Sequence, residues 1–290
     1  MAYNQRMADL YKRFLISSLM LTIIVLLLAF SMYSWVSFLF VIAAAVFAGI
    51  GVWEYAQLAV AKGLAPASRL MITLAVAEVL AYFIALKAQD WWPLPVVVMV
   101  SSVVILFVRH FRDASEALVH IAVEFFGICY LAVPIGLMIG ILYPLSSTGA
   151  LMDGRWWFAY LIFVTKITDV GAYFVGRLWG KHKLAPVLSP KKTVEGAIAG
   201  FLCAWLASLG MYVLGNKFSH GMFHLTFLEA TFLGMLIGVV GQVGDLSESL
   251  LKRDAFVKDS NRLPGLGGVL DMLDSLLLTA PALYFFLLLR

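Results

Sequence analysis

The stretch GQVGDLSESLLKRDAFVKDSNRLPGLGGVLDMLDS, residues 241–275, determines how the whole chain is interpreted. It carries ten charged side chains in 35 residues, whereas only 13% of the chain is charged. Apolar runs flank it at 230–243 and 276–289. Ionisable groups between membrane-type segments are costly to place there and indicate a functional site by default. Carboxylates combined with ammonium groups suit a polyphosphate that carries a divalent cation.

The composition indicates a membrane protein. The chain is 62% hydrophobic with a mean hydropathy of +0.94, which excludes an ordinary soluble domain. A membrane span needs about 20 mostly apolar residues, and nine segments qualify: 14–30, 35–53, 69–86, 93–108, 124–143, 156–176, 195–215, 226–244 and 269–289. We predict an all-α polytopic membrane protein with about nine transmembrane helices. It forms one integral membrane domain, 1–290, in which 1–150 is mainly scaffold and 151–290 carries the catalytic spans and loops.

The basic residues predict the orientation. Nine spans leave five segments on the N-terminal side of the membrane, at 1–13, 54–68, 109–123, 177–194 and 245–268. With Arg69 at a boundary, these segments hold 16 of the 21 Lys and Arg residues. The positive-inside rule assigns such segments to the cytoplasm. We therefore expect a cytoplasmic N-terminus and cytoplasmic charged loops.

A second informative stretch is TKITDVGAYFVGRLWGKHKLAPVLSPKKTVEG, residues 165–196. Asp169 lies on one helix side with Thr165 and Tyr173, and it could simply be neutralised by Lys166. Further on, hydroxyl and ammonium groups lead directly into the next helix, where free backbone N–H groups favour anions. We interpret this loop as a phosphate site, and the alternative is a basic loop that touches anionic lipid headgroups.

Within 241–275, the spacing of Asp245, Glu248 and Lys252 corresponds to one helix face. Asp271 and Asp274 lie one turn apart at the beginning of the last helix, where carboxylates are stable even without a function. That explanation does not account for Asp245 at the end of the preceding span. One or two carboxylates plus substrate phosphates are what Mg²⁺ prefers.

Three glutamates in the first half of the chain lie within an expected span or at the end of one. Glu54 and Glu124 fall at the expected cytoplasmic ends of spans, where we expect exposure to solvent. Glu78 falls in the middle of a span and should face protein or a polar cavity.

Two long motifs resemble the phosphatidate cytidylyltransferases, also called CDP-diacylglycerol synthases. They are TDVGAYFVGRLWGKHKLAPVLSPKKTVEG at 168–196, and GDLSESLLKRDAFVKDS followed by LPGLGGVLDMLDS at 244–275. The resemblance implies that CTP and phosphatidic acid give CDP-diacylglycerol and pyrophosphate in phospholipid biosynthesis, at the cytoplasmic face of an inner membrane. It also implies Mg²⁺ dependence, with a second cation left open, and a homodimer among membrane lipids. No nucleic-acid partner is expected.

This chain departs from the family pattern at two positions, with Leu266 in place of the usual His and Met272 in place of the usual Arg. Arg262 adds a cation that could substitute for them. We expect direct nucleotidyl transfer, in which the protein positions phosphates and stabilises charge. The expected catalytic residues are Asp245, Asp271, Lys252 and Lys192, with Asp245 and Asp271 also as metal ligands. The expected substrate-binding residues are Asp169, Ser189, Lys191, Thr193, Glu248, Arg253, Lys258, Asp259, Arg262, Gly267 and Gly268.

Two other classes of protein remain open from the sequence. A CTP-dependent lipid kinase on a related membrane fold would transfer the γ-phosphoryl group and release CDP. A transporter would place ionisable groups near the middle of several spans, whereas here they cluster near one membrane face.

The topology predicts the labelling of single cysteines. Cysteines introduced at Ser189 and Ser260 should react with a membrane-impermeant thiol reagent only from the cytoplasm, and one at Ser147 only from outside. The measurement is labelling of intact cells against inverted vesicles. Labelling of positions 189 and 260 from opposite sides would exclude a shared site.

Overall fold

The computed structural model describes residues 22, 25–112, 114–144, 152–257 and 268–290, and these residues are mostly helical. Among these described residues, seven helices are long and apolar enough to cross a membrane, and an eighth, Leu94–His110, is shorter. This content confirms the all-α polytopic class. The helices are α2 (Ser34–Ala61), α3 (Ser68–Lys87), α4 (Leu94–His110), α5 (Ala117–Leu142), α6 (Arg155–Trp179), α7 (Val194–Phe218), α8 (Phe227–Asp254) and α9 (Val269–Leu289), with a short 3₁₀ turn η1 (Gln89–Trp91). The expected first span, 14–30, lies mostly outside the described residues.

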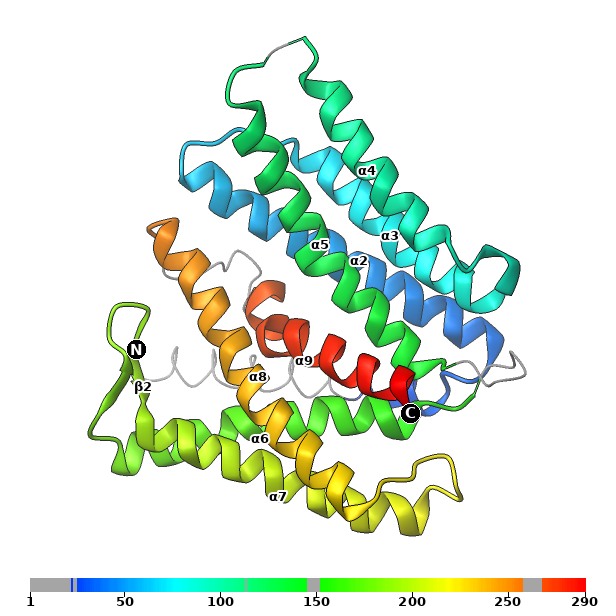
Figure 1. The fold of residues 1–290 in the computed structure, drawn as a ribbon, viewed down its shortest axis with the longest axis vertical. Coiled ribbons are helices and arrows are strands. Elements are labelled where there is room, and N and C mark those ends of the chain that lie inside the picture. The colour runs from blue at the N-terminus through cyan, green and yellow to red at the C-terminus, as the bar shows by residue number, and fades with distance from the viewer. Residues whose placement is uncertain (1–21, 23–24, 113, 145–151, 258–267) are drawn as a thin grey trace, which may run out of the picture.

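The helices form two groups that are joined by α9. Helices α2 to α5 lie side by side along one diagonal of Figure 1, and α6, α7 and α8 pack together below them. Helix α9 lies between the two groups and contacts α5 and α2 on one side and α8 and α6 on the other. The last helix therefore holds the two groups together.

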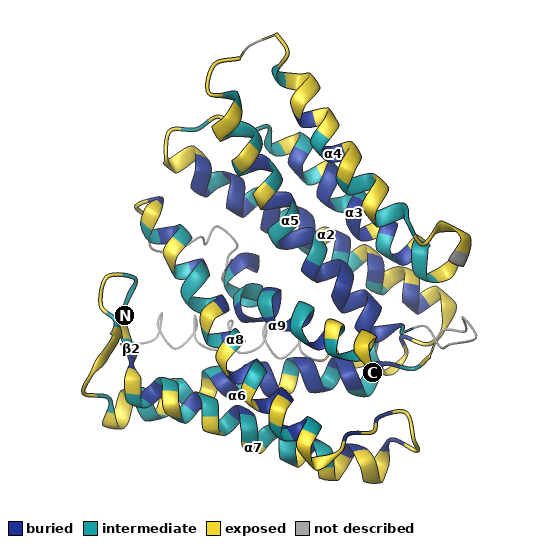
Figure 2. Cartoon of the chain, viewed as in Figure 1, coloured by how far each residue is buried: buried dark blue, intermediate teal, exposed yellow. Residues whose placement is uncertain are grey.

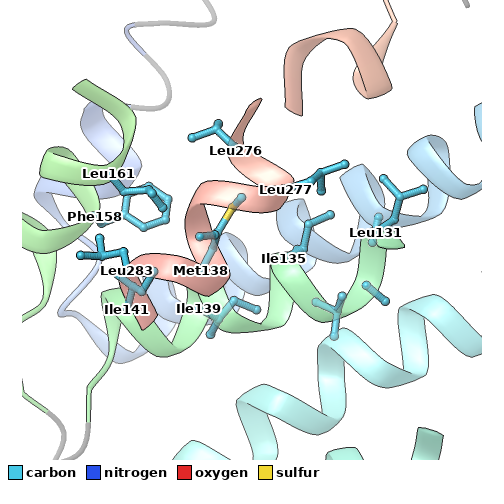
Figure 3. Packing of buried hydrophobic residues seen from close by; sticks show 14 of the residues in the cluster. Leu131, Ile135, Met138, Ile139, Ile141, Phe158, Leu161, Leu276, Leu277 and Leu283 are labelled. Atoms are coloured by element: carbon cyan, nitrogen blue, oxygen red, sulfur yellow. The ribbon is translucent and has the colours of Figure 1, made fainter. Parts of the chain in front are cut away.

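The core follows from this arrangement. Apolar side chains of α5, such as Leu131 and Ile135, meet Leu276 and Leu277 of α9, and Leu161 of α6 closes the cluster (Figure 3). Buried residues line the helix sides that face one another, while the outer sides are exposed and still rich in apolar residues (Figure 2). Outer sides of this kind match a bilayer, because lipid tails offer no hydrogen-bond partners to polar groups.

Small residues let the helices of the first group approach closely. A Cβ atom added at Gly127 of α5 would lie 2.4 Å from the ring of Tyr55, and one at Gly136 would lie 2.2 Å from the ring of Tyr82. The aromatic rings therefore fill the space above the glycines. In lipid, where apolar surface gives helices little reason to associate, such close packing is a main source of association.

Two segments differ from the sequence expectation. Helix α8 continues to Asp254, ten residues beyond the predicted end of its span, so much of the expected loop 245–268 is helix. Hydropathy detects only the lipid-embedded part of a helix, whereas the i, i+4 spacing of charged residues lets α8 continue past it. Residues 183–193 form a small antiparallel hairpin of β1 (Lys183–Ala185) and β2 (Ser189–Thr193), within what was expected to be a loop.

The expectation that Glu54 and Glu124 are exposed is wrong, because their exposed fractions are 2% and 0%. Glu124 accepts hydrogen bonds from the Ala67 backbone at 2.7 Å and from Arg109 Nη1 at 2.6 Å. The end of an apolar run is no guarantee of exposure, because α2 continues seven residues beyond Glu54 and α5 begins seven residues before Glu124. Glu78 is 2% exposed and faces protein, as expected.

The glycine packing predicts a difference between two substitutions. Gly127→Ala should lower the thermal stability of the protein in detergent, because overpacking against Tyr55 costs about 1–3 kcal/mol. Gly210→Ala is the matched control, since a Cβ atom at Gly210 of α7 has nothing within 4 Å. Equal melting temperatures for the two variants would contradict this description of the packing.

Candidate active site

The site is built where α6 and α7 cross in backbone contact. A Cβ atom added at Gly196 would lie 3.0 Å from Gly176 Cα and 2.7 Å from the Ala172 carbonyl oxygen. Only glycine permits this approach. Thr193 caps the N-terminus of α7 by accepting a hydrogen bond from the Gly196 N–H at 3.2 Å. The end of β2 and the first turn of α7 are thereby held against α6.

A cavity of about 590 Å³ opens between α6, the hairpin, α7 and α8. Its walls combine basic groups with two carboxylates, one from α6 and one from α8. The charged lining residues are Asp169, Arg177, Lys183, Lys191, Lys192 and Asp245. Lys192 Nζ lies 2.7 Å from Asp245 Oδ2, so β2 and α8 are joined by an ion pair inside the cavity. Four cations facing two carboxylates favour an anionic ligand.

A group of carboxylates extends from the cavity toward α9. Asp274 interacts electrostatically with both Asp245 and Asp169. Lys166 Nζ lies 3.6 Å from Asp169 and 4.0 Å from Asp274. Ser275 Oγ donates toward Asp169 at 3.3 Å. The proposed neutralisation of Asp169 by Lys166 is therefore present, and the same lysine also serves Asp274.

A second cluster lies further along α8 and does not line the cavity. Lys252 is 8% exposed and pairs with Glu248 at 2.5 Å and with Asp271 at the beginning of α9. Lys252 is thus a buried link between α8 and α9, and it does not face the open cavity.

The hairpin is attached to α8 near this cluster. Arg253 Nε donates to the Leu188 carbonyl oxygen at 3.0 Å, across the turn between β1 and β2. One residue later, Asp254 pairs with Lys62, the residue that follows α2, at 3.0 Å. The end of α8 is therefore fixed to both the hairpin and the first helix group.

The structure separates the residues that the sequence assigned to one site. Lys191, Lys192, Thr193, Asp169 and Asp245 line the cavity. Ser189 lies in β2, Arg253 supports the hairpin, Glu248 and Lys252 form the buried cluster with Asp271, and Gly268 precedes α9. Lys258, Asp259, Arg262 and Gly267 lie outside the described residues, as do Leu266 and the loop that holds them.

Sequence reasoning missed several contributors to the site. Arg177 and Lys183 line the cavity, and Ser275 bridges two of the carboxylates. The signal for Arg177 was its i+8 spacing from Asp169, which predicts the same helix side. Nothing in the local pattern distinguishes Ser275, because its role depends on a residue of α6, 106 positions away.

The charge balance is compatible with a divalent cation. In the ion pairs of this region, five carboxylates share three ammonium groups. The carboxylates belong to Asp169, Asp245, Glu248, Asp271 and Asp274, and the ammonium groups to Lys166, Lys192 and Lys252. Among the described residues, no three Asp, Glu, His or Cys side chains already form a metal cluster. Mg²⁺ does not need one, since it is commonly held by one or two carboxylates together with phosphate oxygens.

The fold and cavity define a polytopic membrane protein with a cavity lined by four cations and two carboxylates. The chain belongs to the Cytidylyltransferase family, whose model matches residues 11–290. It is 36% identical to a phosphatidate cytidylyltransferase of Chlamydia pneumoniae, covering 97% of this chain and 92% of the relative. It is 34% identical to that of Chlamydia muridarum, covering 97% and 93%. It is 42% identical to that of Staphylococcus haemolyticus over 132 residues, covering 45% and 48%.

The ion pair in the cavity predicts the effect of removing its lysine. Lys192→Ala should lower cytidylyl-transfer activity about 10- to 100-fold, because an interaction with a charged group contributes about 1.5–3 kcal/mol. The measurement is initial rate at saturating substrate, together with thermal unfolding to verify the fold. Lys217→Ala, in the last turn of α7 and outside the cavity, is the control. Near-normal activity of Lys192→Ala would assign the lysine to headgroup contact.

Proposed function

We propose that this chain is a phosphatidate cytidylyltransferase, which transfers CMP from CTP to phosphatidic acid and releases pyrophosphate. The cavity carries this proposal, because a basic wall and an acidic group meet at the ends of membrane helices. Membership of the Cytidylyltransferase family and the similarity over 97% of the chain to named phosphatidate cytidylyltransferases support it. Nothing in these findings favours the lipid kinase or the transporter.

The reaction needs charge neutralisation more than covalent chemistry. A phosphate oxygen of phosphatidic acid attacks the α-phosphorus of CTP, the bond to the β-phosphate oxygen breaks, and pyrophosphate leaves with that electron pair. Two anions must approach each other for this to happen. Four cations line one cavity and can offset the negative charge of both the CTP phosphates and the lipid phosphate. They are Arg177, Lys183, Lys191 and Lys192.

Arg177 is suited to the lipid phosphate. It lies in the last turn of α6, where exposed apolar side chains such as Leu178 and Trp179 mark the side that would face lipid. Tyr173, one turn earlier, accepts a hydrogen bond from Arg177 Nη1 at 2.7 Å and lines the cavity as well. A guanidinium group binds phosphate oxygens in a planar, two-pronged manner. The nucleotide would approach from the hairpin side.

Mg²⁺ is part of the proposal. Asp245 and Asp271 remain the proposed ligands, and Asp274 adds a third carboxylate close to Asp245. Asp271 is engaged by Lys252, so its use as a ligand requires the lysine to share it. When bound, the ion would offset the negative charge that develops on the leaving pyrophosphate. A second cation is left open.

The membrane orientation and the assembly are also proposals. The excess of Lys and Arg on one side favours a site that faces the cytoplasm of an inner membrane. The resemblance to the family favours a homodimer.

The reaction is tested by comparing CTP labelled at the α-phosphate with CTP labelled at the γ-phosphate. Purified protein with phosphatidic acid and Mg²⁺ should move label from the α-phosphate of CTP into the lipid phase, with one pyrophosphate released for each lipid product. A label at the γ-phosphate should stay in water, whereas a lipid kinase would transfer it to lipid.

Asp245→Asn serves as the control for contaminating host enzyme and should be inactive, as should Asp271→Asn if both carboxylates hold the cation. Chelation of divalent cations should stop the wild-type reaction. Absence of α-label from lipid with every divalent cation tried would reject the proposed function.

A further inference from the structure

Glu54 of α2 binds the beginning of α9 directly. Its Oε1 accepts a hydrogen bond from the Val269 N–H at 3.0 Å, and its Oε2 accepts one from the Leu270 N–H at 2.8 Å. The carboxylate is 2% exposed and lies 215 residues before its first partner in the chain. A buried carboxylate that bridges two adjacent backbone amides is a specific arrangement, since burial of a charge without partners is costly.

The first turn of α9 has little other support for its amide groups. Gly268, the residue before the helix, has no side chain and makes no side-chain cap. The first N–H groups of a helix have no partner within the helix, and they carry its positive end. Glu54 satisfies two of them and places a negative charge where that end favours one.

The two amides lie immediately before Asp271, the residue that holds Lys252. Lys252 in turn interacts electrostatically with Glu54. Any shift in the first turn of α9 therefore moves Asp271 and changes the ion pair with α8. Asp274, one turn later and close to Asp245, would move with it.

The geometry assigns Glu54, on the helix group expected to be mere scaffold, as a positioning residue that sets the place of Asp271 and Lys252 in the active site. Gly51, one turn before it, lies against the same turn of α9, because a Cβ atom there would be 3.7 Å from Val269. The kinetic consequence rests on the proposed function, whereas the structural consequence does not.

Hydrogen exchange tests the contact without reference to activity. Glu54→Gln keeps the size of the side chain but removes the charge and one acceptor oxygen. Backbone amides in a peptide covering the first turn of α9 should then exchange about 10-fold faster, because a hydrogen bond to a charged group is lost. Peptides from α3 and α7 should be unchanged. Unaltered exchange at the beginning of α9 would overturn the assignment.

Kinetics test the positioning role. Glu54→Gln should lower kcat about 10-fold with little change in KM for CTP, because misplacing a catalytic group affects the transition state more than ground-state binding. Glu124→Gln is the matched control, since Glu124 is also a fully buried carboxylate that accepts a backbone N–H, but at the beginning of α3. It should reduce thermal stability and leave kcat unchanged. Equal kcat values for both variants would reduce Glu54 to a structural residue.

A substitution on the other side of the contact covers the case in which Glu54→Gln does not fold. Val269→Pro removes the N–H that Glu54 Oε1 accepts, at a first-turn position that tolerates proline. Gly268 already has the extended conformation that precedes proline, with ψ 148°. It should also lower kcat, and the double variant should lose less than the product of the two single effects. Independent, multiplicative losses would contradict a shared contact.

Discussion

Charge pairing at the end of the bundle where α8 finishes and α9 begins is the constraint on which the rest of the structure depends. A buried ion pair contributes little net stability, but removal of one partner costs about 3–5 kcal/mol because the other charge stays buried. Lys252, held between Glu248 and Asp271, therefore fixes the spacing of α8 and α9. Lys192 joins the hairpin to Asp245 of α8 through a more exposed ion pair. The apolar packing of α5 against α9 brings these elements together, and the charges determine their register.

The same constraint explains why the site is divided between an open cavity and a closed cluster. The cavity side carries more cations than carboxylates and can receive phosphates. In the other cluster, Lys252 and Glu248 are buried and Asp271 is partly exposed, and their ion pairs hold α9 in place. A catalyst that works by positioning needs both parts, since groups that meet substrate keep their geometry only when the helices behind them cannot slide.

The sequence predicted the membrane class and singled out the two charged motifs, because hydropathy and helix spacing are local properties. It also assigned Lys192 and Asp245 to one site from two separate motifs, and their side chains lie 2.7 Å apart in the structure. It could not predict that Glu54 is buried, because that depends on the approach of α9, more than 200 positions later. Hydropathy also ended the span of α8 at residue 244, whereas the spacing of Asp245, Glu248 and Lys252 on one helix face agrees with a helix that continues to Asp254.

The attachment of the hairpin to α8 has a consequence for how sequences of this kind can diverge. The Arg253 side chain binds the backbone carbonyl oxygen of Leu188, and the Leu188 side chain takes no part in this hydrogen bond. Every amino acid offers that same oxygen, so the turn between β1 and β2 can change its residues freely while the attachment survives. Arg253 has less freedom, because the contact needs a long side chain with a hydrogen-bond donor near its end. We therefore expect selection to retain Arg253, whereas the residue at position 188 can vary.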